Sequence, residues 1–307
     1  MKRRILALMM GAVLAISMIA CGGGDSAESS SESAGEEATA DASAESGSEE
    51  GGSGEYKISI ILKTLSAEYW NFVKAGCDAY AAENPGVSID VKGPTSETAF
   101  DEQQNMIETD LNSGAYDAFI ISPLQADTVT TLISGEEKPI IALDTDIDAP
   151  EVLTFVGTGN ENAAAMGGEA GGTFLADETQ YADAVADKAV TSMEAIMQNH
   201  PEGVAIICAN NDDMAIAAAR AAAGNAAYEN TIFLGFNGDK TACEAILADE
   251  LDMSVAQEAY NMGYLSVQEA VKALEGEELE EFTDSGCDVV TSENAQERLD
   301  TLNSYLE

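Results

Sequence analysis

From Tyr56 onward, short apolar runs alternate with stretches of helical periodicity, and this alternation limits the possible folds more than any other feature. Short apolar runs are typical of buried strands, and each one recurs after a stretch long enough to form a helix. Such a strand–helix repeat predicts parallel sheets covered by helices. The expected strands are Lys57–Leu62, Val87–Val91, Ala118–Ile121, Pro139–Leu143, Leu153–Val156, Val204–Ala209, Thr231–Phe236 and Asp252–Ala256.

Helices are expected between these strands. The first, at about residues 67–82, places Trp70, Val73 and Cys77 on one face, and Asn84-Pro85-Gly86 ends it. The strands and helices form two successive series, which predicts an α/β protein with two doubly wound parallel-sheet lobes and a ligand cleft between them. The other expected helices are Asn162–Leu175, Ala182–Gln198, Asp213–Ala223, Lys240–Leu247, one ending at Gly276, and Ala295–Leu306.

The chain of 307 residues is long enough for two lobes and an N-terminal extension. We expect an N-terminal α/β lobe over residues 56–158, completed by part of the C-terminal segment. A shortened C-terminal α/β lobe is expected over residues 159–290, followed by a C-terminal helix over residues 291–307.

The N-terminus has the pattern of an export signal. Lys2-Arg3-Arg4 precedes the apolar run Ile5–Ala20, so residues 1–20 are predicted to be a signal peptide. The segment from Ser17 to Cys21 resembles a bacterial lipobox, which implies cleavage before Cys21 and a lipid on its sulfur. The alternative is a secretory signal with a chance cysteine. A membrane-spanning helix fits less well, because the apolar run is short and a polar segment follows it.

Residues 21–55 are predicted to be a lipid-anchored, acidic Ser/Gly/Glu linker, because this composition cannot bury enough apolar surface to order the chain. As a flexible coil it would span roughly 30 Å on average and about 110 Å when extended. The remaining residues contain 46 acidic against 10 basic side chains, a net charge of about −36. This charge argues against binding to nucleic acid or to anionic membranes.

Four cysteines follow the linker, and none has the spacing of a zinc site. We favour buried free thiols, since Cys77 and Cys208 lie among apolar neighbours on expected elements. An exported chain could also pair them, and the four allow three disulfide connectivities; the other two are Cys243 and Cys287. No cofactor or metal is expected.

Six short motifs follow the expected strands or begin the helices after them. They are Tyr69-Trp70, Ile121-Ser122-Pro123-Leu124, Ala142-Leu143-Asp144, Asn211-Asp212-Asp213-Met214-Ala215, Leu234-Gly235-Phe236-Asn237-Gly238 and Val255-Ala256-Gln257. In this order and spacing, the chain resembles the sugar-binding proteins of bacterial ABC transporters of the ribose, xylose and galactose type. These proteins have the type 1 periplasmic binding protein fold, and the resemblance covers most of residues 57–290.

The first-lobe motifs have the chemistry that a sugar requires. Aromatic rings cover the C–H faces of a sugar, and planar amides and carboxylates bind its hydroxyl groups. Tyr69 and Trp70 open the first helix where a ring can reach the cleft; the alternative is core packing, because Trp70 shares a face with Val73. Asp144 follows an apolar run, and the resemblance implies a hydroxyl-binding aspartate there; the alternative is a cap or turn.

The second-lobe motifs supply amides. The resemblance implies that Asn211 binds hydroxyl groups while Asp212 is structural, although Asn211 could simply cap the next helix. Asn237 stands where many family members have aspartate. A carboxylate only accepts hydrogen bonds, whereas the Asn237 amide also donates them. Gln257 corresponds to a family glutamine in the cleft, with a polar strand end as the alternative.

Other functional motifs are rejected. Asp144, Asp146 and Asp148 mimic the start of a calcium loop but lack its glycine and glutamate. Residues 157–162 match a dinucleotide-binding pattern without its third glycine. His200 is the single histidine and reads as a loop residue, so no catalytic Ser/His/Asp set is present. An enzyme is therefore not expected.

The chain departs from the family between Gly172 and Val204, where the pattern predicts one helix and no strand. Family members have a further strand, helix and strand there, which usually supply an arginine to the sugar. We therefore expect a truncated second lobe, with a smaller sheet and an exposed edge.

The resemblance implies an extracytoplasmic substrate-binding lipoprotein of an ABC importer that binds a ribose-, xylose- or galactose-like monosaccharide. Its implied partners are the ABC permease and its ATPase, and a monomer anchored to the bacterial cell membrane through Cys21 is expected. Two alternatives stay open: a sugar-sensing receptor for a membrane signalling protein, and an extracellular carbohydrate-active enzyme.

Overall fold

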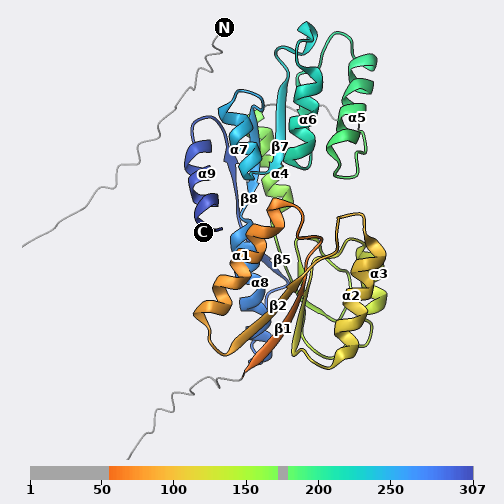
Figure 1. The fold of residues 1–307 in the computed structure, drawn as a ribbon, viewed down its shortest axis with the longest axis vertical. Helices are drawn as coiled ribbons and strands as arrows, with labels where there is room; N and C mark the ends of the chain where they lie inside the picture. The colour runs from red at the N-terminus through yellow and green to blue at the C-terminus, as the bar shows by residue number, and fades with distance from the viewer. Residues whose placement is uncertain (1–54, 172–178, 307) are drawn as a thin grey trace, which may run out of the picture. The chain divides into compact units, whose positions relative to one another are not determined.

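The computed structural model describes residues 55–171 and 179–306, which form two β-sheets with helices packed against them (Figure 1). The predicted signal peptide, Cys21 and nearly all of the predicted linker lie outside the described residues. Within the described part, no helix is both long and apolar enough to cross a membrane.

The first sheet has six strands in the order β2-β1-β3-β4-β5-β9, and every neighbouring pair is parallel. The chain runs outward from β1 to β2 and then returns to β3 on the other side of β1. This reversal is the topological switch point, where such sheets place their ligands at the carboxyl ends of the strands. The strands are β1 (Tyr56–Ile61), β2 (Val87–Lys92), β3 (Ala118–Ile121), β4 (Ile140–Leu143), β5 (Val152–Gly157) and β9 (Phe282–Asp284).

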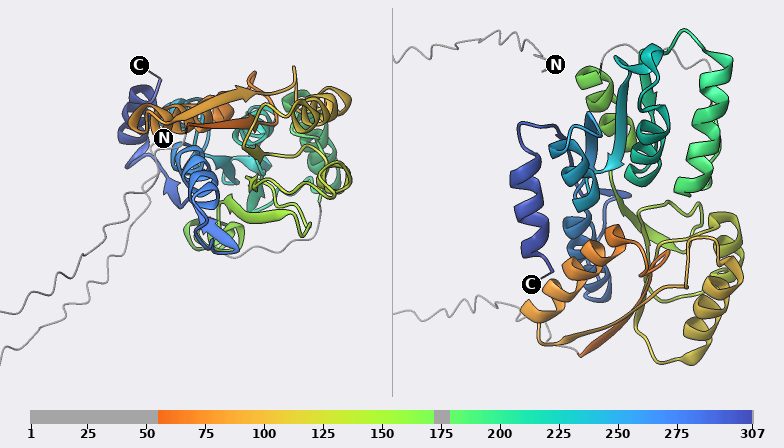
Figure 2. Two further views of the ribbon diagram at one scale, coloured as in Figure 1. Left: turned by 90° about the horizontal axis from the view of Figure 1, so that it is seen from below. Right: turned by 45° about the horizontal axis from the view of Figure 1, so that its top comes forward.

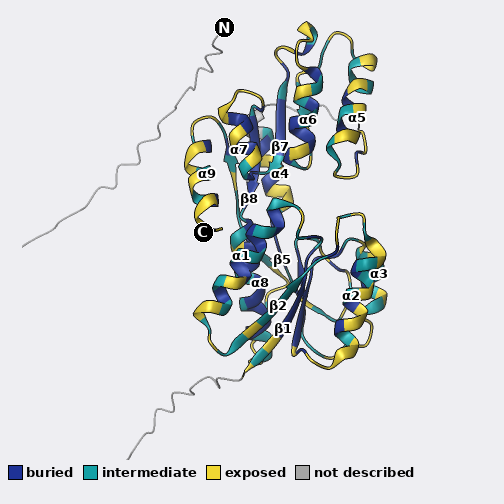
Figure 3. Ribbon diagram, viewed as in Figure 1, coloured by how far each residue is buried: buried dark blue, intermediate teal, exposed yellow. Residues whose placement is uncertain are grey.

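Helices cover both faces of this sheet. The helices α1 (Glu68–Glu83) and α8 (Ala259–Leu274) lie on one face, and α2 (Phe100–Ser113) and α3 (Ala126–Leu132) lie on the other (Figures 1 and 2). Alternate residues of β1 therefore face opposite cores: Ile60 packs in the α1/α8 core, whereas Ile61 packs in the α2/α3 core. The inner strands β3 and β4 are buried along their whole length, whereas the edge strand β2 has no buried residue (Figure 3).

Two glycines bring α1 and α8 into backbone contact. A Cβ atom added to Gly76 would lie 1.9 Å from the carbonyl oxygen of Tyr260, and one added to Gly263 would lie 1.9 Å from that of Val73. Any side chain here would separate the helices, so glycine is required for this close approach. The contact fixes α1, whose first turn contains Tyr69 and Trp70, against the sheet.

The second sheet has four strands in the order β10-β8-β7-β6, of which only β10 runs antiparallel. Helix α4 packs against β7, β8 and β10, α6 packs against β7 and α5, and α9 packs against α7. The strands are β6 (Ile206–Cys208), β7 (Ile232–Asn237), β8 (Met253–Gln257) and β10 (Cys287–Val290). The helices are α4 (Asn160–Gly171), α5 (Ala186–Asn199), α6 (Asp212–Ala222), α7 (Lys240–Leu247) and α9 (Ala295–Ser304), with a short 3-10 helix, η1 (Ala226–Tyr228).

We call the six-stranded sheet with α1, α2, α3 and α8 the first lobe, and the four-stranded sheet with α4 to α7 and α9 the second lobe. This architecture confirms the predicted α/β fold with two parallel-sheet lobes. The first lobe also contains α8 and β9, which come from residues 159–290, the segment from which we expect part of the chain to complete this lobe. Strands β9 and β10 were missed, because they are short and contain polar residues that hide the strand pattern.

The second sheet is smaller than the first, and among the described residues β6 forms one of its two edges and β10 the other. Residues 179–204 contain one helix and no strand, and residues 172–178 lie outside the described part. We expected buried cysteines, and this is wrong for Cys208, which is exposed because it lies on an edge strand. Cys77 and Cys243 are buried, and Cys287 is half-buried. All four cysteines are free thiols, and burial raises the pKa of Cys77 to about 12. A truncation relative to the family stays a prediction.

Candidate functional site

Asp144 lies at the carboxyl end of β4 and is the centre of a polar cluster in the first lobe. Its Oδ2 atom accepts a hydrogen bond from the Lys63 ammonium at 2.7 Å, and its Oδ1 atom accepts one from the Tyr69 hydroxyl at 3.2 Å. Its backbone has φ 62°, a left-handed conformation that costs a non-glycine residue energy. The bonds from Lys63 and Tyr69 hold the carboxylate in one place beyond the strand end, and they offset the cost of this backbone conformation.

Lys63 was not among the predicted site residues. It follows β1 and Leu62, and its Nζ atom also donates to Thr145 Oγ1 at 2.7 Å and lies 5.6 Å from the centre of the Trp70 ring. A basic residue directly after a buried strand, in a chain with so few basic residues, was the available signal. The strand-end argument that selected Asp144 applies equally to Lys63.

Tyr69 and Trp70 begin α1 and are almost fully buried, with 7% and 3% of their surface exposed. Their rings meet edge to face at 5.0 Å, and the Trp70 Nε1–H donates to Glu97 Oε1 at 2.8 Å. Burial, followed by the negative charge of Asp144, raises the pKa of the Tyr69 hydroxyl well above its usual value. The two rings thus belong to the core and to the polar cluster at once, and ligand contact stays a prediction for both.

Gln257 and Asn237 form a chain of amides in the second lobe. The Gln257 Nε2 atom donates to Asn237 Oδ1 at 2.9 Å, and Gln257 Oε1 accepts from the Thr158 hydroxyl at 2.8 Å. Thr158 follows β5 of the first lobe, whereas Gln257 ends β8 of the second, so this bond joins the two lobes. Among the described residues the Asn237 amide accepts this bond and donates none, so its two N–H groups can bind other partners.

Asn211 caps helix α6: its Oδ1 atom accepts from the backbone N–H of Met214 at 2.8 Å, as the capping alternative predicts. No hydrogen bond among the described residues joins Asn211 to Asn237 or Gln257. The next residue, Asp212, is fully buried, and it accepts from the Ser254 hydroxyl and from the backbone N–H of Asp239. Asp212 is structural, in agreement with the expectation from the resemblance.

A second contact between the lobes involves the first turns of α1 and α7. Glu68 Oε1 pairs with the Lys240 ammonium at 2.9 Å, and Glu68 Oε2 accepts from the Lys240 backbone N–H at 3.2 Å. The carboxylate thereby completes the N-terminus of α7, where negative charge is favourable. Behind it in α9, Arg298 donates to the backbone oxygens of Gly238 and Gln257, which fixes the strand ends next to Asn237.

The six predicted ligand residues therefore fall into three groups. Tyr69, Trp70 and Asp144 lie together in the first lobe, Asn237 and Gln257 lie together in the second, and Asn211 stands apart as a helix cap. The described residues contain no cluster of three or more His, Cys, Asp or Glu side chains that could hold a metal ion.

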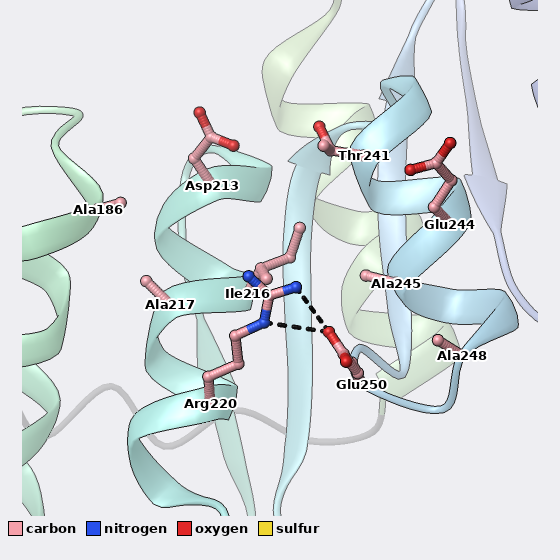
Figure 4. Close-up of a pocket in the computed structure, with 10 residues that line it drawn as sticks. All are labelled: Ala186, Asp213, Ile216, Ala217, Arg220, Thr241, Glu244, Ala245, Ala248 and Glu250. Atoms are coloured by element: carbon pink, nitrogen blue, oxygen red, sulfur yellow. Dashed lines mark hydrogen bonds and ion pairs between the residues drawn. The ribbon is translucent and has the colours of Figure 1, made fainter.

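A cavity of about 930 Å³ is lined by none of the six predicted ligand residues, although it borders two of their neighbours. Its lining includes Thr158, the partner of Gln257, and Asp146, two residues beyond Asp144, with Phe155 and Phe282 on its apolar side. A smaller cavity of about 360 Å³ lies between α5, α6 and α7, where Arg220 pairs with Glu250 (Figure 4). Small alanine side chains form much of the lining of the smaller cavity, and none of the six predicted ligand residues lines it.

The comparisons with known proteins agree with this architecture. The ribose import binding protein RbsB of Bacillus subtilis is 23% identical over 271 residues, which span 75% of this chain and 85% of that protein. The D-allose-binding periplasmic protein of Escherichia coli is 26% identical over 262 residues, spanning 70% and 83%. A solved carbohydrate transporter solute-binding protein from Agrobacterium radiobacter, in complex with D-arabinose, is 21% identical and superposes with a TM-score of 0.71 over 81% of this chain and 98% of its own.

A family model covers the larger part of the chain. The periplasmic binding protein domain matches residues 58–182 and 170–278, which include the strand ends of both lobes. The chain therefore belongs to the periplasmic binding protein domain family.

Proposed function

We propose that this chain is the extracytoplasmic substrate-binding lipoprotein of an ABC importer and binds a monosaccharide between its two lobes. The observation that supports this most is that each lobe has polar side chains at the ends of its strands. These are Asp144 in the first lobe and the Asn237 and Gln257 amides in the second. Carboxylates and amides in fixed positions suit the hydroxyl groups of a sugar. The named ligands of the relatives, ribose, D-allose and D-arabinose, are all neutral monosaccharides.

Ligand binding can be tested by thermal shift against a panel of monosaccharides. A ligand that binds only the folded state raises stability by RT ln(1 + [L]/Kd), which is about 2.7 kcal/mol at a hundredfold excess over Kd. Trp70 is the single tryptophan of the chain and contacts the polar cluster, so its fluorescence gives a second readout. A panel in which no sugar changes either signal would overturn the proposal.

We propose that the protein binds sugar without converting it and passes it to a membrane permease with its ATPase. Incubation of stoichiometric sugar with the protein should return the sugar unchanged, and product formation would favour the carbohydrate-active enzyme. Reconstituted permease should take up sugar only when this protein is present. A monomer is proposed as the functional form, and its elution volume in size-exclusion chromatography tests this.

The lipid anchor belongs to the same proposal and rests on the sequence around Cys21. Cys21→Ser removes the sulfur that would bear the lipid, so the variant should remain uncleaved or leave the membrane when it is washed. Unchanged retention of a correctly cleaved variant would contradict lipid attachment at this residue.

A further inference from the structure

The larger cavity, of about 930 Å³, is lined by residues of both lobes. The first lobe contributes Asp146 after β4, Phe155 of β5, and Phe282 and Asp284 of β9, whereas the second lobe contributes the first turns of α4. The cavity therefore borders the connection from β5 to α4, where the chain passes from one lobe to the other. Since none of the six predicted ligand residues lines it, it is a second place at which a ligand could bind.

Two phenylalanine rings form the apolar side of this cavity. The ring centres of Phe155 and Phe282 lie 5.4 Å apart, and the ring planes are tilted by 34°. The Phe155 ring lies directly over Gly157, because a Cβ atom added to this glycine would lie 2.4 Å from the ring. Phe282 is 41% exposed, and so is 45% of Leu153, which shares a face of β5 with Phe155. An aromatic surface is thus open to solvent between the lobes.

Asp284 places a fixed carboxylate beside the rings. Its Oδ1 atom accepts hydrogen bonds from the backbone N–H groups of Gly159 and Gly286, at 3.2 and 3.0 Å. Among the described residues no hydrogen bond reaches its Oδ2 atom. Because both bonds come from the backbone, the carboxylate is held in place while one of its oxygens stays available for a ligand.

The charged side chains around the cavity are all acidic. Asp146, Glu161 and Glu281 line it together with Asp284, and within the described part of the chain no lysine, arginine or histidine does. Carboxylates that share a cavity without a basic side chain repel one another and make its potential negative. An anion would add to this repulsion and a neutral molecule would leave it unchanged, whereas a cation relieves it.

Aromatic rings and carboxylates together match an organic cation. An ammonium group over the face of an aromatic ring is attracted by the negative charge of that face, and apolar groups on the same molecule pack against the ring. Asp284 Oδ2 supplies a charge of opposite sign next to the rings. A bare metal ion fits less well, since the described residues contain no cluster of three or more potential metal ligands.

We propose that this cavity is a binding site for a small organic cation with an apolar surface, such as a quaternary ammonium compound. Phe282 and Asp284 are its principal contacts. The site lies outside the set of residues predicted to bind sugar, so this inference goes beyond the proposed function and does not depend on it.

Choline and its neutral analogue 3,3-dimethylbutan-1-ol test the proposal, because the two have the same shape and differ in the charged nitrogen. Binding to the full-length chain is measured without sugar, by isothermal titration calorimetry and by saturation-transfer NMR. Phe282→Leu removes the ring and keeps an apolar side chain. Asp284→Asn removes the charge and keeps an oxygen that can accept both backbone bonds. Asp101→Asn makes the same change at an exposed position on α2 and is the matched control.

Choline should bind wild type at least about threefold more tightly than the neutral analogue, and added NaCl should weaken only choline. Phe282→Leu should weaken choline binding by about 3- to 30-fold, the loss of one cation–π contact. Asp284→Asn should weaken it by about two- to fivefold, as expected for an exposed charge, while Asp101→Asn leaves it unchanged.

Three results would overturn the inference. They are no detectable choline binding, equal affinity for choline and the neutral analogue, and an equal loss in Asp101→Asn and Asp284→Asn, which would indicate diffuse attraction to an acidic protein. Melting temperatures of the variants exclude loss of folding as the cause, and either cavity variant serves alone if the other does not fold. Failure of every sugar to bind would overturn the proposed function and not this inference, because choline binding is measured without sugar.

Discussion

Replacing Asp212 with asparagine should remove a large part of the pH dependence of this protein's stability. Asp212 is fully buried at the start of α6, and its two oxygens contact the Ser254 hydroxyl and the backbone N–H of Asp239. Desolvation, followed by the charge of Asp239, raises the pKa of the Asp212 carboxyl to about 8. Burial also raises the pKa of Asp239.

The sign follows from the proton balance. In the unfolded chain an aspartate releases its proton near pH 4, whereas folded Asp212 holds it to higher pH. The contribution of Asp212 to the free energy of unfolding is therefore largest below about pH 4. This contribution is lost as the pH rises from about 4 toward about 8. Each bound proton changes the free energy of unfolding by about 1.4 kcal/mol per pH unit, or about 3 kcal/mol between pH 5 and pH 7.

Asp212→Asn replaces the protonated acid by a neutral amide of the same shape. Its Nδ2–H can donate to Ser254 Oγ, and its oxygen can accept from the Asp239 N–H, so both buried contacts have a counterpart. Urea unfolding at pH 5, 6, 7 and 8 should show a steep decline for wild type and a flatter one for the variant. Asp213→Asn, at the exposed neighbouring position, should leave the decline unchanged.

Parallel stability curves for wild type and Asp212→Asn would refute the argument, because they would show that Asp212 is ionised in the folded protein at neutral pH. A variant less stable than wild type at every pH, with the same slope, would lead to the same conclusion.

Three further predictions concern the site and the packing of the two lobes. Asp144→Asn should lower the affinity for sugar by about 10- to 100-fold in calorimetry with little change in melting temperature; loss of folding instead would favour a structural role. Gly263→Ala should destabilise the protein by about 1–3 kcal/mol in urea unfolding, because its Cβ would lie 1.9 Å from the Val73 carbonyl oxygen, and an unchanged midpoint would show that α1 and α8 can separate freely. Hydrogen exchange should protect β6 and β7 less than β1 and β3, since the smaller sheet buries less apolar surface, whereas even protection would contradict a weaker second lobe.

Local patterns were sufficient to predict the kinds of elements and many of their positions. Ala118–Ile121 and Lys240–Leu247 have the predicted bounds, and other ends differ by only a few residues, because apolar periodicity and turn residues act over short distances. The same local reasoning placed Asp144 beyond β4 and identified the capping alternative for Asn211, which the structure shows. These features depend on neighbours in the chain, so they can be read from the sequence.

The sequence determined the α/β class, the order of strands and helices, and which polar residues follow strands, because each depends on a short stretch of chain. Only the tertiary structure decided which of those residues meet. Lys63 and Asp144 are 81 positions apart in the sequence. Their side chains meet because β1 and β4 are separated by a single strand, β3, in the sheet. Likewise α8 and β9 join the first lobe, and Cys208 is exposed on an edge strand, since strand order and sheet size set these positions. Strand order is set by packing between distant segments, and no local pattern encodes it.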